Sequence, residues 1–136
     1  MEVTNALYPT EAQYETLHAS PETGEIQLLN LFKFREKAQY PDGRDSDLSG
    51  KEAYDLYGKP MLEVLTEYGA EVVYFAELTE MVIGQVEDLW DAAVIVKYPS
   101  RKALLEMTSS EEFKALAIHR EAGLEGQLNI EMKIPN

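Results

Sequence analysis

The chain has 136 residues, of which 45% are hydrophobic, and its formal net charge is −13 at pH 7. This length allows one domain with a single sizeable core, and the negative charge argues against nucleic acid and anionic membrane surfaces as partners. The sequence has no cysteine, which excludes disulfides and thiolate chemistry, and it shows no signal-like or membrane-spanning apolar run, so we expect a cytoplasmic protein.

The beginning of the chain predicts a short helix over residues 9–19, where a proline and a threonine favour the start. We assign residues 1–24 to an N-terminal extension and residues 25–136 to one domain. Residues 25–34, EIQLLNLFKF, are apolar on both parities, which is typical of a strand covered on both faces. A long exposed loop follows, rich in charged and turn-forming residues.

From Ser49 the apolar spacing becomes that of a helix with one wide apolar face. Ser49 and Glu52 form a predicted capping box, and Gly69 ends the helix. Two strands rich in β-branched and aromatic residues follow at 71–77 and 89–98, and an extension of the first through MVIG stays open.

The last third of the chain predicts a short helix from Ser100, a helix over 111–122 with a capping box in SSEE, and a strand over 127–134. The order is that of a ferredoxin-like α+β fold, βαββαβ, with a four-stranded antiparallel sheet and two helices on one face. The other face would leave apolar side chains in water. We therefore predict a homodimer in which two sheets pack face to face, a dimeric α+β barrel.

Arg120 is the most informative single residue. It shares one face of its helix with three apolar residues, so its guanidinium points towards the core. A buried arginine without a partner is costly. Two interpretations stay open: a structural ion pair with Asp91, Glu77 or a helix-end carbonyl, and a clamp for a substrate carboxylate or enolate.

His119 borders the same face, and histidine is the side chain best suited to carry a proton at neutral pH. We therefore treat His119 and Arg120 as candidate catalytic residues. The alternative for His119 is a half-exposed position near the helix C-terminus, where its cation is favoured by the helix dipole.

Six further residues are candidates for substrate binding. Aromatic side chains could line a pocket for a planar substrate or fill the core, and a buried polar side chain needs a partner in a cavity or an interface. The candidates are Asn30, Tyr54, Tyr57, Trp90, Asp91 and Tyr98. For each of them the structural and the functional interpretation stay open.

No cofactor or metal is expected. The sequence has no glycine-rich phosphate loop, and its two histidines, His18 and His119, lie too far apart in the chain for a metal motif. A heme would have His119 as its sole available histidine ligand in the domain.

Several segments in order, among them NLFKFREKAQY, SGKEAYDLYGKPMLEVLTEYGAEVVY, LWDAAVIVKYPSRKALLEM and SSEEFKALAIHREAGLEGQ, resemble domain-of-unknown-function family 1330 of the dimeric α+β barrel superfamily. The resemblance spans residues 25–134. It implies a fold and a dimer, but no reaction. Members of the superfamily include cofactor-free monooxygenases of aromatic polyketides, muconolactone isomerase, aldoxime dehydratases and heme-dependent chlorite dismutases, so the fold does not fix the chemistry.

Two functions follow as hypotheses. In the first, each subunit encloses a small-molecule cavity and acts as a cofactor-independent, monooxygenase- or isomerase-like enzyme, with Arg120 holding an anionic group. In the second, the dimer is a non-catalytic binding or structural module whose interior is packed solid. An open cavity beside Arg120 would favour the first, and side chains filling that space would favour the second.

Overall fold

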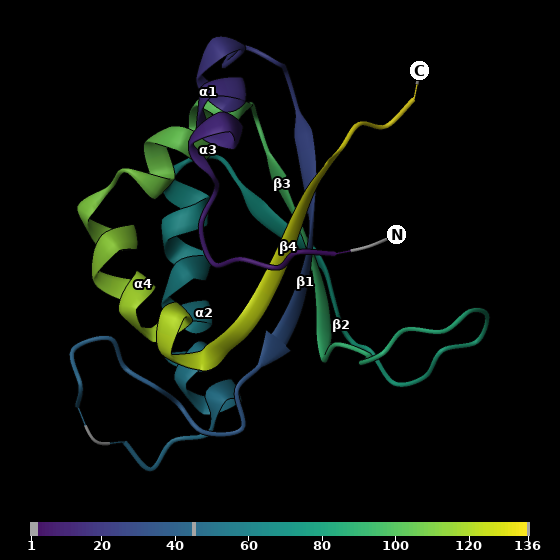
Figure 1. The fold of residues 1–136 in the computed structure, drawn as a ribbon. Coiled ribbons are helices and arrows are strands. Elements are labelled where there is room, and N and C mark those ends of the chain that lie inside the picture. The colour runs from purple at the N-terminus through teal and green to yellow at the C-terminus, as the bar shows by residue number, and fades with distance from the viewer. Residues whose placement is uncertain (1–2, 45, 136) are drawn as a thin grey trace.

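The computed structural model describes residues 3–44 and 46–135 (Figure 1). In chain order its elements are α1 (Glu11–Ala19), β1 (Ile26–Phe34), α2 (Gly50–Glu67), β2 (Glu71–Glu77), β3 (Ala92–Tyr98), α3 (Arg101–Thr108), α4 (Glu111–Gly123) and β4 (Leu124–Met132). The sequence β1, α2, β2, β3, α4, β4 is the predicted ferredoxin-like order. α1 precedes it, and α3 lies between β3 and α4.

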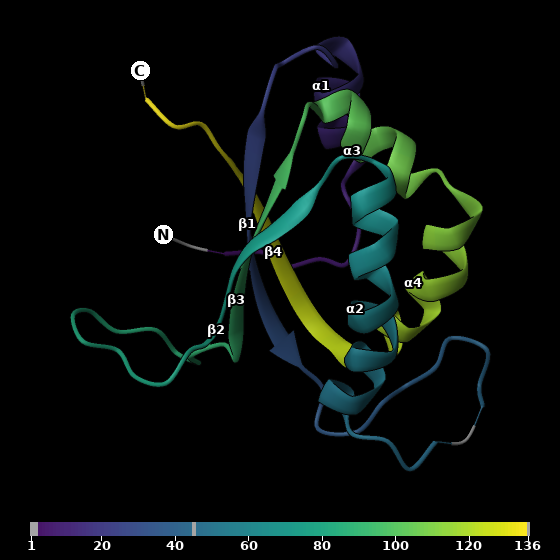
Figure 2. The same cartoon turned by 180° about the vertical axis from the view of Figure 1, so that it is seen from behind.

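The four strands form one antiparallel sheet in the order β2-β3-β1-β4. Helices α2 and α4 lie against one face of this sheet, which we call the inner face, and the opposite face is open (Figures 1 and 2). Along β1 and β3 buried side chains on the inner face alternate with partly exposed ones on the open face. The main core therefore lies between the sheet and the helices.

Helix α2 begins as the sequence predicts. The Ser49 hydroxyl accepts a hydrogen bond from the Glu52 backbone N–H at 3.0 Å, and the Glu52 carboxylate accepts one from the Ser49 N–H at 3.0 Å. The helix continues without interruption through Pro60. Gly69 follows with φ +73°, a left-handed conformation that favours glycine and reverses the chain into β2.

α2 and α4 approach each other closely at two glycines, Gly50 and Gly123. A Cβ atom on Gly123 would collide with the carbonyl oxygen of Gly50, and it would lie 2.7 Å from the Tyr54 backbone nitrogen. Just after β1, the Arg35 N–H donates to Gly123 O at 2.8 Å, and Gly50 N–H donates to Arg35 O at 3.1 Å. These contacts join the beginning of α2, the end of α4 and the end of β1 in one place.

β2 spans Glu71–Glu77 as predicted, and the open extension through MVIG is excluded: MVIG lies in a protruding loop, because the partner strand β3 begins opposite Glu77, at Ala92. Other predicted boundaries were wrong. β3 begins three residues later than predicted, and β4 begins at Leu124, immediately after α4, and ends at Met132. The predicted capping box in SSEE is a simple cap: Ser110 accepts from the backbone N–H of Phe113, whose own side chain has no oxygen to return the bond.

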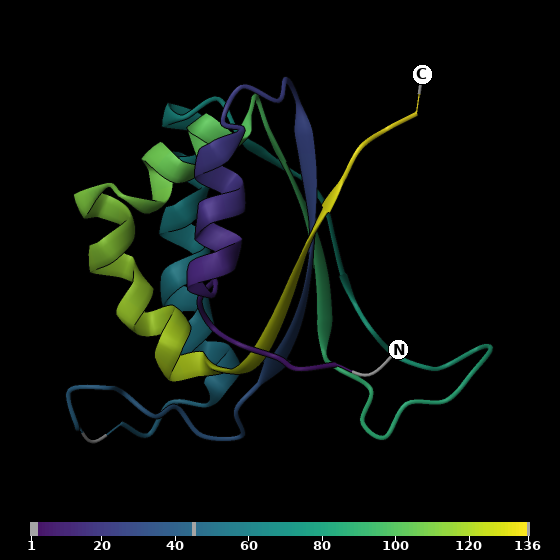
Figure 3. The same ribbon diagram turned by 45° about the horizontal axis from the view of Figure 1, so that its top comes forward.

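The residues that precede β1 lie beside β4 and α3. We call residues 5–9 the N-terminal strap. Within it, the Ala6 N–H donates to Gln127 O at 3.3 Å on the free edge of β4, and Leu7 packs against the core. α1 then lies against α3 (Figure 3), and none of its residues is buried. The strap thus closes the side of the molecule at which β4 and α4 meet.

Candidate functional site

Three polar side chains form a hydrogen-bonded chain in the interior, which we call the interior polar cluster. Arg120, only 6% exposed, donates from Nη1 to Gln127 Oε1 at 2.7 Å. Gln127 in turn donates from Nε2 to Asn30 Oδ1 at 2.9 Å. Asn30, also 6% exposed, donates over longer distances to the backbone oxygens of Leu28, 3.3 Å away, and Val94, 3.4 Å away.

The local sequence explains how these three side chains meet. Arg120 lies on the inward face of the last turn of α4, as the helical spacing predicts. α4 passes directly into β4, which places Gln127 on the inner face opposite Phe32 of β1. Asn30 lies two residues before Phe32 on β1, and therefore on the same face. A helix and two neighbouring strands thus each contribute one member.

The charge of Arg120 is poorly compensated. In residues 3–44 and 46–135 it forms no ion pair with an aspartate or glutamate, and its buried Nε has no hydrogen-bond partner. Burial lowers the pKa of Arg120, because desolvation disfavours the charged form, although the tyrosines Tyr57, Tyr54 and Tyr14 oppose this effect. The buried ion pair that a structural role of Arg120 would require is therefore absent from the described residues.

Aromatic side chains surround this part of the interior. Tyr54 of α2 packs against Phe32 with ring centroids 5.0 Å apart and against Tyr57 at 5.5 Å, and Tyr57 packs against Phe113 of α4 at 6.2 Å. Burial raises the pKa of Tyr54, Tyr57 and also Tyr98, so all three hydroxyls remain protonated at neutral pH. They can donate hydrogen bonds to an anion without adding negative charge of their own.

One more aromatic residue reaches Arg120, and the sequence did not point to it. The ring of Tyr8, in the N-terminal strap, lies over the Arg120 guanidinium with the Cζ atom 4.8 Å from the ring centroid. This is a cation–π contact, yet Tyr8 itself is 46% exposed. A tyrosine in an irregular segment has no periodicity that would orient it, so no local pattern could have assigned this contact.

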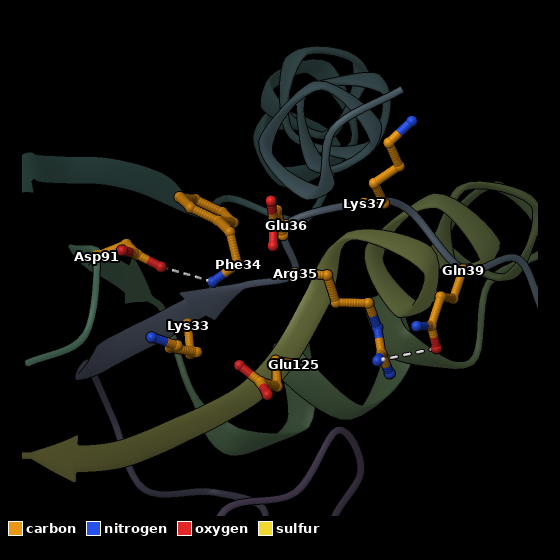
Figure 4. Close-up of a pocket in the computed structure, with 8 residues that line it drawn as sticks. All are labelled: Lys33, Phe34, Arg35, Glu36, Lys37, Gln39, Asp91 and Glu125. Carbon is orange, nitrogen blue, oxygen red and sulfur yellow. Dashed lines mark hydrogen bonds between the residues drawn. The ribbon is translucent and has the colours of Figure 1, made fainter. Parts of the chain in front are cut away.

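The remaining predicted site residues lie elsewhere. His119 is hydrogen-bonded through Nδ1 to the Tyr40 hydroxyl at 2.8 Å, beside the loop that follows β1. Asp91 accepts a hydrogen bond from the Phe34 N–H at 2.7 Å, shown in Figure 4, and is not the counter-ion of Arg120. Trp90 is partly buried next to Asp91 at the beginning of β3. The structure thus brings together Arg120, Asn30, Tyr54 and Tyr57, while His119 and Asp91 are hydrogen-bonded to other partners.

Two cavities on the surface of the described residues stand out, and Arg120 lines neither. The larger, about 560 Å³, carries side chains of both charges (Figure 4); it is lined by Lys33, Phe34, Arg35, Glu36, Lys37, Gln39, Asp91 and Glu125. In it the Nε of Arg35 is also buried without a partner, but the Arg35 side chain is partly exposed and donates to Gln39 at 3.2 Å. The second, about 270 Å³, lies beside the C-terminal part of β4.

Two kinds of site were also searched for in the described part of the chain. Among residues 3–44 and 46–135, no three histidine, aspartate or glutamate side chains gather closely enough to hold a metal ion. None of the helices in these two ranges has both the length and the apolar character needed to cross a bilayer.

The antiparallel sheet order, with α2 and α4 on one face, places the protein in the ferredoxin-like α+β class. Residues 45–132 match the family described as "Domain of unknown function (DUF1330)", and the chain belongs to this family. The match covers the greater part of the span over which the sequence resembles it. No protein with a curated description matches the chain.

Solved structures agree with this assignment. The RPA0582 protein of unknown function from Rhodopseudomonas palustris is 32% identical, with a TM-score of 0.86 over 98% of this chain and 99% of that chain. SnoaB, a cofactor-independent oxygenase from Streptomyces nogalater, is 10% identical, with a TM-score of 0.54 over 84% of this chain and 96% of its own. A dabb family protein with a ferredoxin-like fold from Mesorhizobium loti is 13% identical, with a TM-score of 0.50 over 84% and 100%. The last two similarities show the fold alone.

Proposed function

We propose that the protein is a homodimer that binds a small organic anion, a carboxylate, enolate or phenolate, between the sheet and the helices, with Arg120 as its anchor. One observation carries this proposal: Arg120 is buried and charged, but no carboxylate pairs with it in the described residues and its Nε has no partner. A buried charge without a counter-charge is expensive, and an anionic ligand would remove that cost.

The geometry suits an anion with one or two oxygens. Arg120 uses Nη1 for Gln127, which leaves the Nε–H for a ligand oxygen. The protonated hydroxyls of Tyr54 and Tyr57 belong to α2, and both lie near enough to Arg120 for its charge to lower their pKa against the larger effect of burial. Asn30, through Gln127, fixes the orientation of the guanidinium before any ligand arrives.

The same groups would assist a cofactor-independent reaction. A fixed cation and hydroxyl donors in a dry interior stabilise an enolate or phenolate as negative charge develops on it, which is the usual source of catalysis at such sites. The proposal rests on Arg120 and the tyrosines. His119, about 100° around the helix, is hydrogen-bonded to Tyr40 on the loop side of α4 and takes no part in this proposal.

The homodimer is supported by the open face of the sheet. Its side chains there are largely apolar and include Leu29, Leu31, Tyr74, Ile95, Leu128, Ile130 and Met132. A continuous apolar face of this kind marks an interface in most proteins, and a second copy can cover it by two-fold symmetry. The cytoplasmic location expected from the sequence stays a prediction.

The second candidate function is a structural dimer module without a ligand. It is favoured by the covering of Arg120: the ring of Tyr8 lies on the guanidinium, and neither surface cavity reaches it. If the protein binds an anion at Arg120, the Tyr8 side chain must move aside for the ligand. Tyr8 is 46% exposed, so the core does not enclose its side chain.

A thermal-shift screen with small carboxylates and phenols tests the first function against the second. A ligand at a hundredfold excess over its Kd stabilises the native protein by about 2.7 kcal/mol. We expect at least one compound to shift the wild type and leave Arg120→Met unshifted. The matched control is Arg44→Met, which removes an arginine from an exposed loop and should respond like the wild type.

The stability of the free variant separates the two functions further. Replacing an uncompensated buried charge by an apolar side chain is neutral or stabilising, so Arg120→Met should unfold at the wild-type temperature or above it. If no compound shifts the wild type and Arg120→Met alone is destabilised, Arg120 is structural and the second function holds.

A further inference from the structure

Residues 78–91, which connect β2 to β3, form an arm that leaves the body of the protein on the open side of the sheet. All three views show it pointing away from the helices (Figures 1, 2 and 3). Its tip carries Val82 and Ile83, which are 90% and 89% exposed, and Val86 behind them is 51% exposed. Two adjacent β-branched apolar side chains are therefore almost fully in water.

The base of the arm is firmly attached. Leu78 N–H donates to Asp91 O at 2.9 Å, and Asp91 N–H donates to Phe32 O at 2.8 Å, so both ends are tied to the sheet. Farther out, Lys33 forms an ion pair with Asp88 at 2.7 Å. Lys33 lies on the open face of β1, so this pair ties the arm to the open side of the sheet.

The tip differs in charge from the rest of the protein. Residues 81–86, MVIGQV, contain no ionisable side chain in a chain whose net charge is −13. The acidic residues of the arm, Glu80, Glu87 and Asp88, lie on either side of this segment. The buried centre of a protein interface is poor in charged residues and its rim is polar, and the arm has the same arrangement, with an uncharged apolar tip between acidic residues.

We propose that the arm is a clasp for a second copy of this chain. The inference rests on the proposed homodimer and specifies how the dimer is held. A copy packed on the open face lies on the side towards which the arm projects. Because a two-fold interface is self-complementary, both arms would extend over the partner at once and bury their tips against it.

The size of the sheet supports this role. Four strands about 4.8 Å apart and about eight residues long offer a face of roughly 500 Å². Stable interfaces bury about 800 Å² on each partner. The flat area is a lower bound on the accessible surface of the sheet face, and the arm is adjacent apolar surface that would add to an interface built on it.

The test is sedimentation equilibrium of the full chain and the double variant Val82→Glu/Ile83→Glu. Burying two new charges should raise the dimer Kd at least thirtyfold, roughly the effect of losing an interface hot spot. The matched control, Leu56→Glu/Leu62→Glu, adds the same charge at exposed apolar positions of α2, on the helix side, and should leave the Kd unchanged. Circular dichroism of each variant verifies that it is folded.

The outcomes separate the clasp from the dimer itself. If the wild type is a monomer at tens of micromolar, the proposed homodimer is wrong, and the clasp with it. If the wild type is a dimer and the arm variant has the same Kd, the dimer stands and the clasp is wrong.

A second measurement does not depend on a disruptive variant. The chain has no cysteine, so Ile83→Cys introduces a unique thiol at the tip. Its rate of reaction with a thiol reagent should fall at least tenfold from monomeric to dimeric protein concentrations. A rate independent of concentration, in protein shown to dimerise, would contradict the clasp.

Discussion

His119 and Arg120 are neighbours on α4, yet they lie in two different polar regions. His119 meets Tyr40 edge-on, with ring centroids 5.5 Å apart and a hydrogen bond of 2.8 Å, and Arg44 lies over the same tyrosine ring. We call His119, Tyr40 and Arg44 the loop cluster. It is partly exposed, and the polar atoms of His119 and Tyr40 are hydrogen-bonded to each other. In the interior polar cluster Arg120 and Asn30 are buried and Gln127 is partly buried, and Arg120 Nε has no partner there.

The two regions differ in whether their polar groups are satisfied within the protein. The loop cluster fastens the segment after β1 onto α4, and its hydrogen bond is complete without any other molecule. The interior polar cluster has a net positive charge and an unused donor, so its electrostatics are incomplete without one. A rotation of about 100° between consecutive helical residues is enough to place two ionisable side chains in such unlike surroundings.

The largest effect on stability is expected at the close contact between α2 and α4, because α4 carries a residue of each polar region. Gly123→Ala places a Cβ against the backbone of Gly50 and Tyr54, which must move. We expect a loss of about 3 kcal/mol in the free energy of unfolding, measured by urea denaturation. The control is Gly58→Ala in the middle of α2, where the Cβ would meet nothing closer than 3.5 Å and should stabilise the protein slightly. Equal urea midpoints for the two variants would contradict the tight contact.

The next effect concerns the interior polar cluster. Gln127→Leu removes the acceptor of Arg120 Nη1 and the donor to Asn30, so a buried cation loses its hydrogen bond. We expect a loss of about 2 kcal/mol. In the Arg120→Met background the same change should cost less, because no charge remains to be satisfied. A double-mutant cycle with additive effects would show that the two side chains are not coupled.

A smaller effect is expected in the loop cluster. Tyr40→Phe deletes the hydroxyl that bonds to His119 and keeps the ring, so the loss should be about 1 kcal/mol. Any ligand that shifts the wild type should shift this variant equally, because the loop cluster lies outside the proposed site. Tyr14→Phe, at an exposed tyrosine of α1, is the control for stability. An altered ligand response in Tyr40→Phe would connect the two regions functionally.

The smallest effect is expected at the ion pair between Arg101 and Glu131. Unlike Arg120, this arginine has a carboxylate partner and is in contact with solvent. The hydrogen bond from Arg101 lowers the pKa of Glu131, so the pair stabilises the protein above the ordinary pKa of 4.5 and this stability is lost as the pH falls through the lowered value. With side-chain exposures of 18% and 34%, we expect Glu131→Gln to cost about 0.5 kcal/mol at pH 7. The difference from wild type should shrink towards pH 3 and in high salt; a constant difference would rule out the ionic contribution.

Much of the fold could be predicted because its signals are local. The Ser49 cap, the Gly69 stop and the period of each apolar run depend on a few adjacent residues, and they give the element order and the inward direction of Arg120. Strand ends were less accurate, because the end of β2 is decided by where β3 begins. That pairing joins residues far apart in the chain.

The candidate site was predicted less completely, for the same reason. Arg120, Asn30, Tyr54 and Tyr57 were identified because each is a polar or amphipathic residue at a core-facing position. Their mutual contacts depend on tertiary packing, which no local pattern predicts. Gln127 was missed because a glutamine is common on a strand with one solvent-exposed face, so nothing in the sequence marked it.

The edges of the sheet have a consequence for the solubility of the protein. Ala6 pairs with Gln127 and shields part of β4, while β2 has a glutamate at each end and a register irregularity between Val72 and Tyr74. Bulged, charged or covered strands are poor templates for further strands. Chains therefore cannot easily add edge to edge into an open-ended fibre, whereas the proposed face-to-face pairing is a closed association that ends at two.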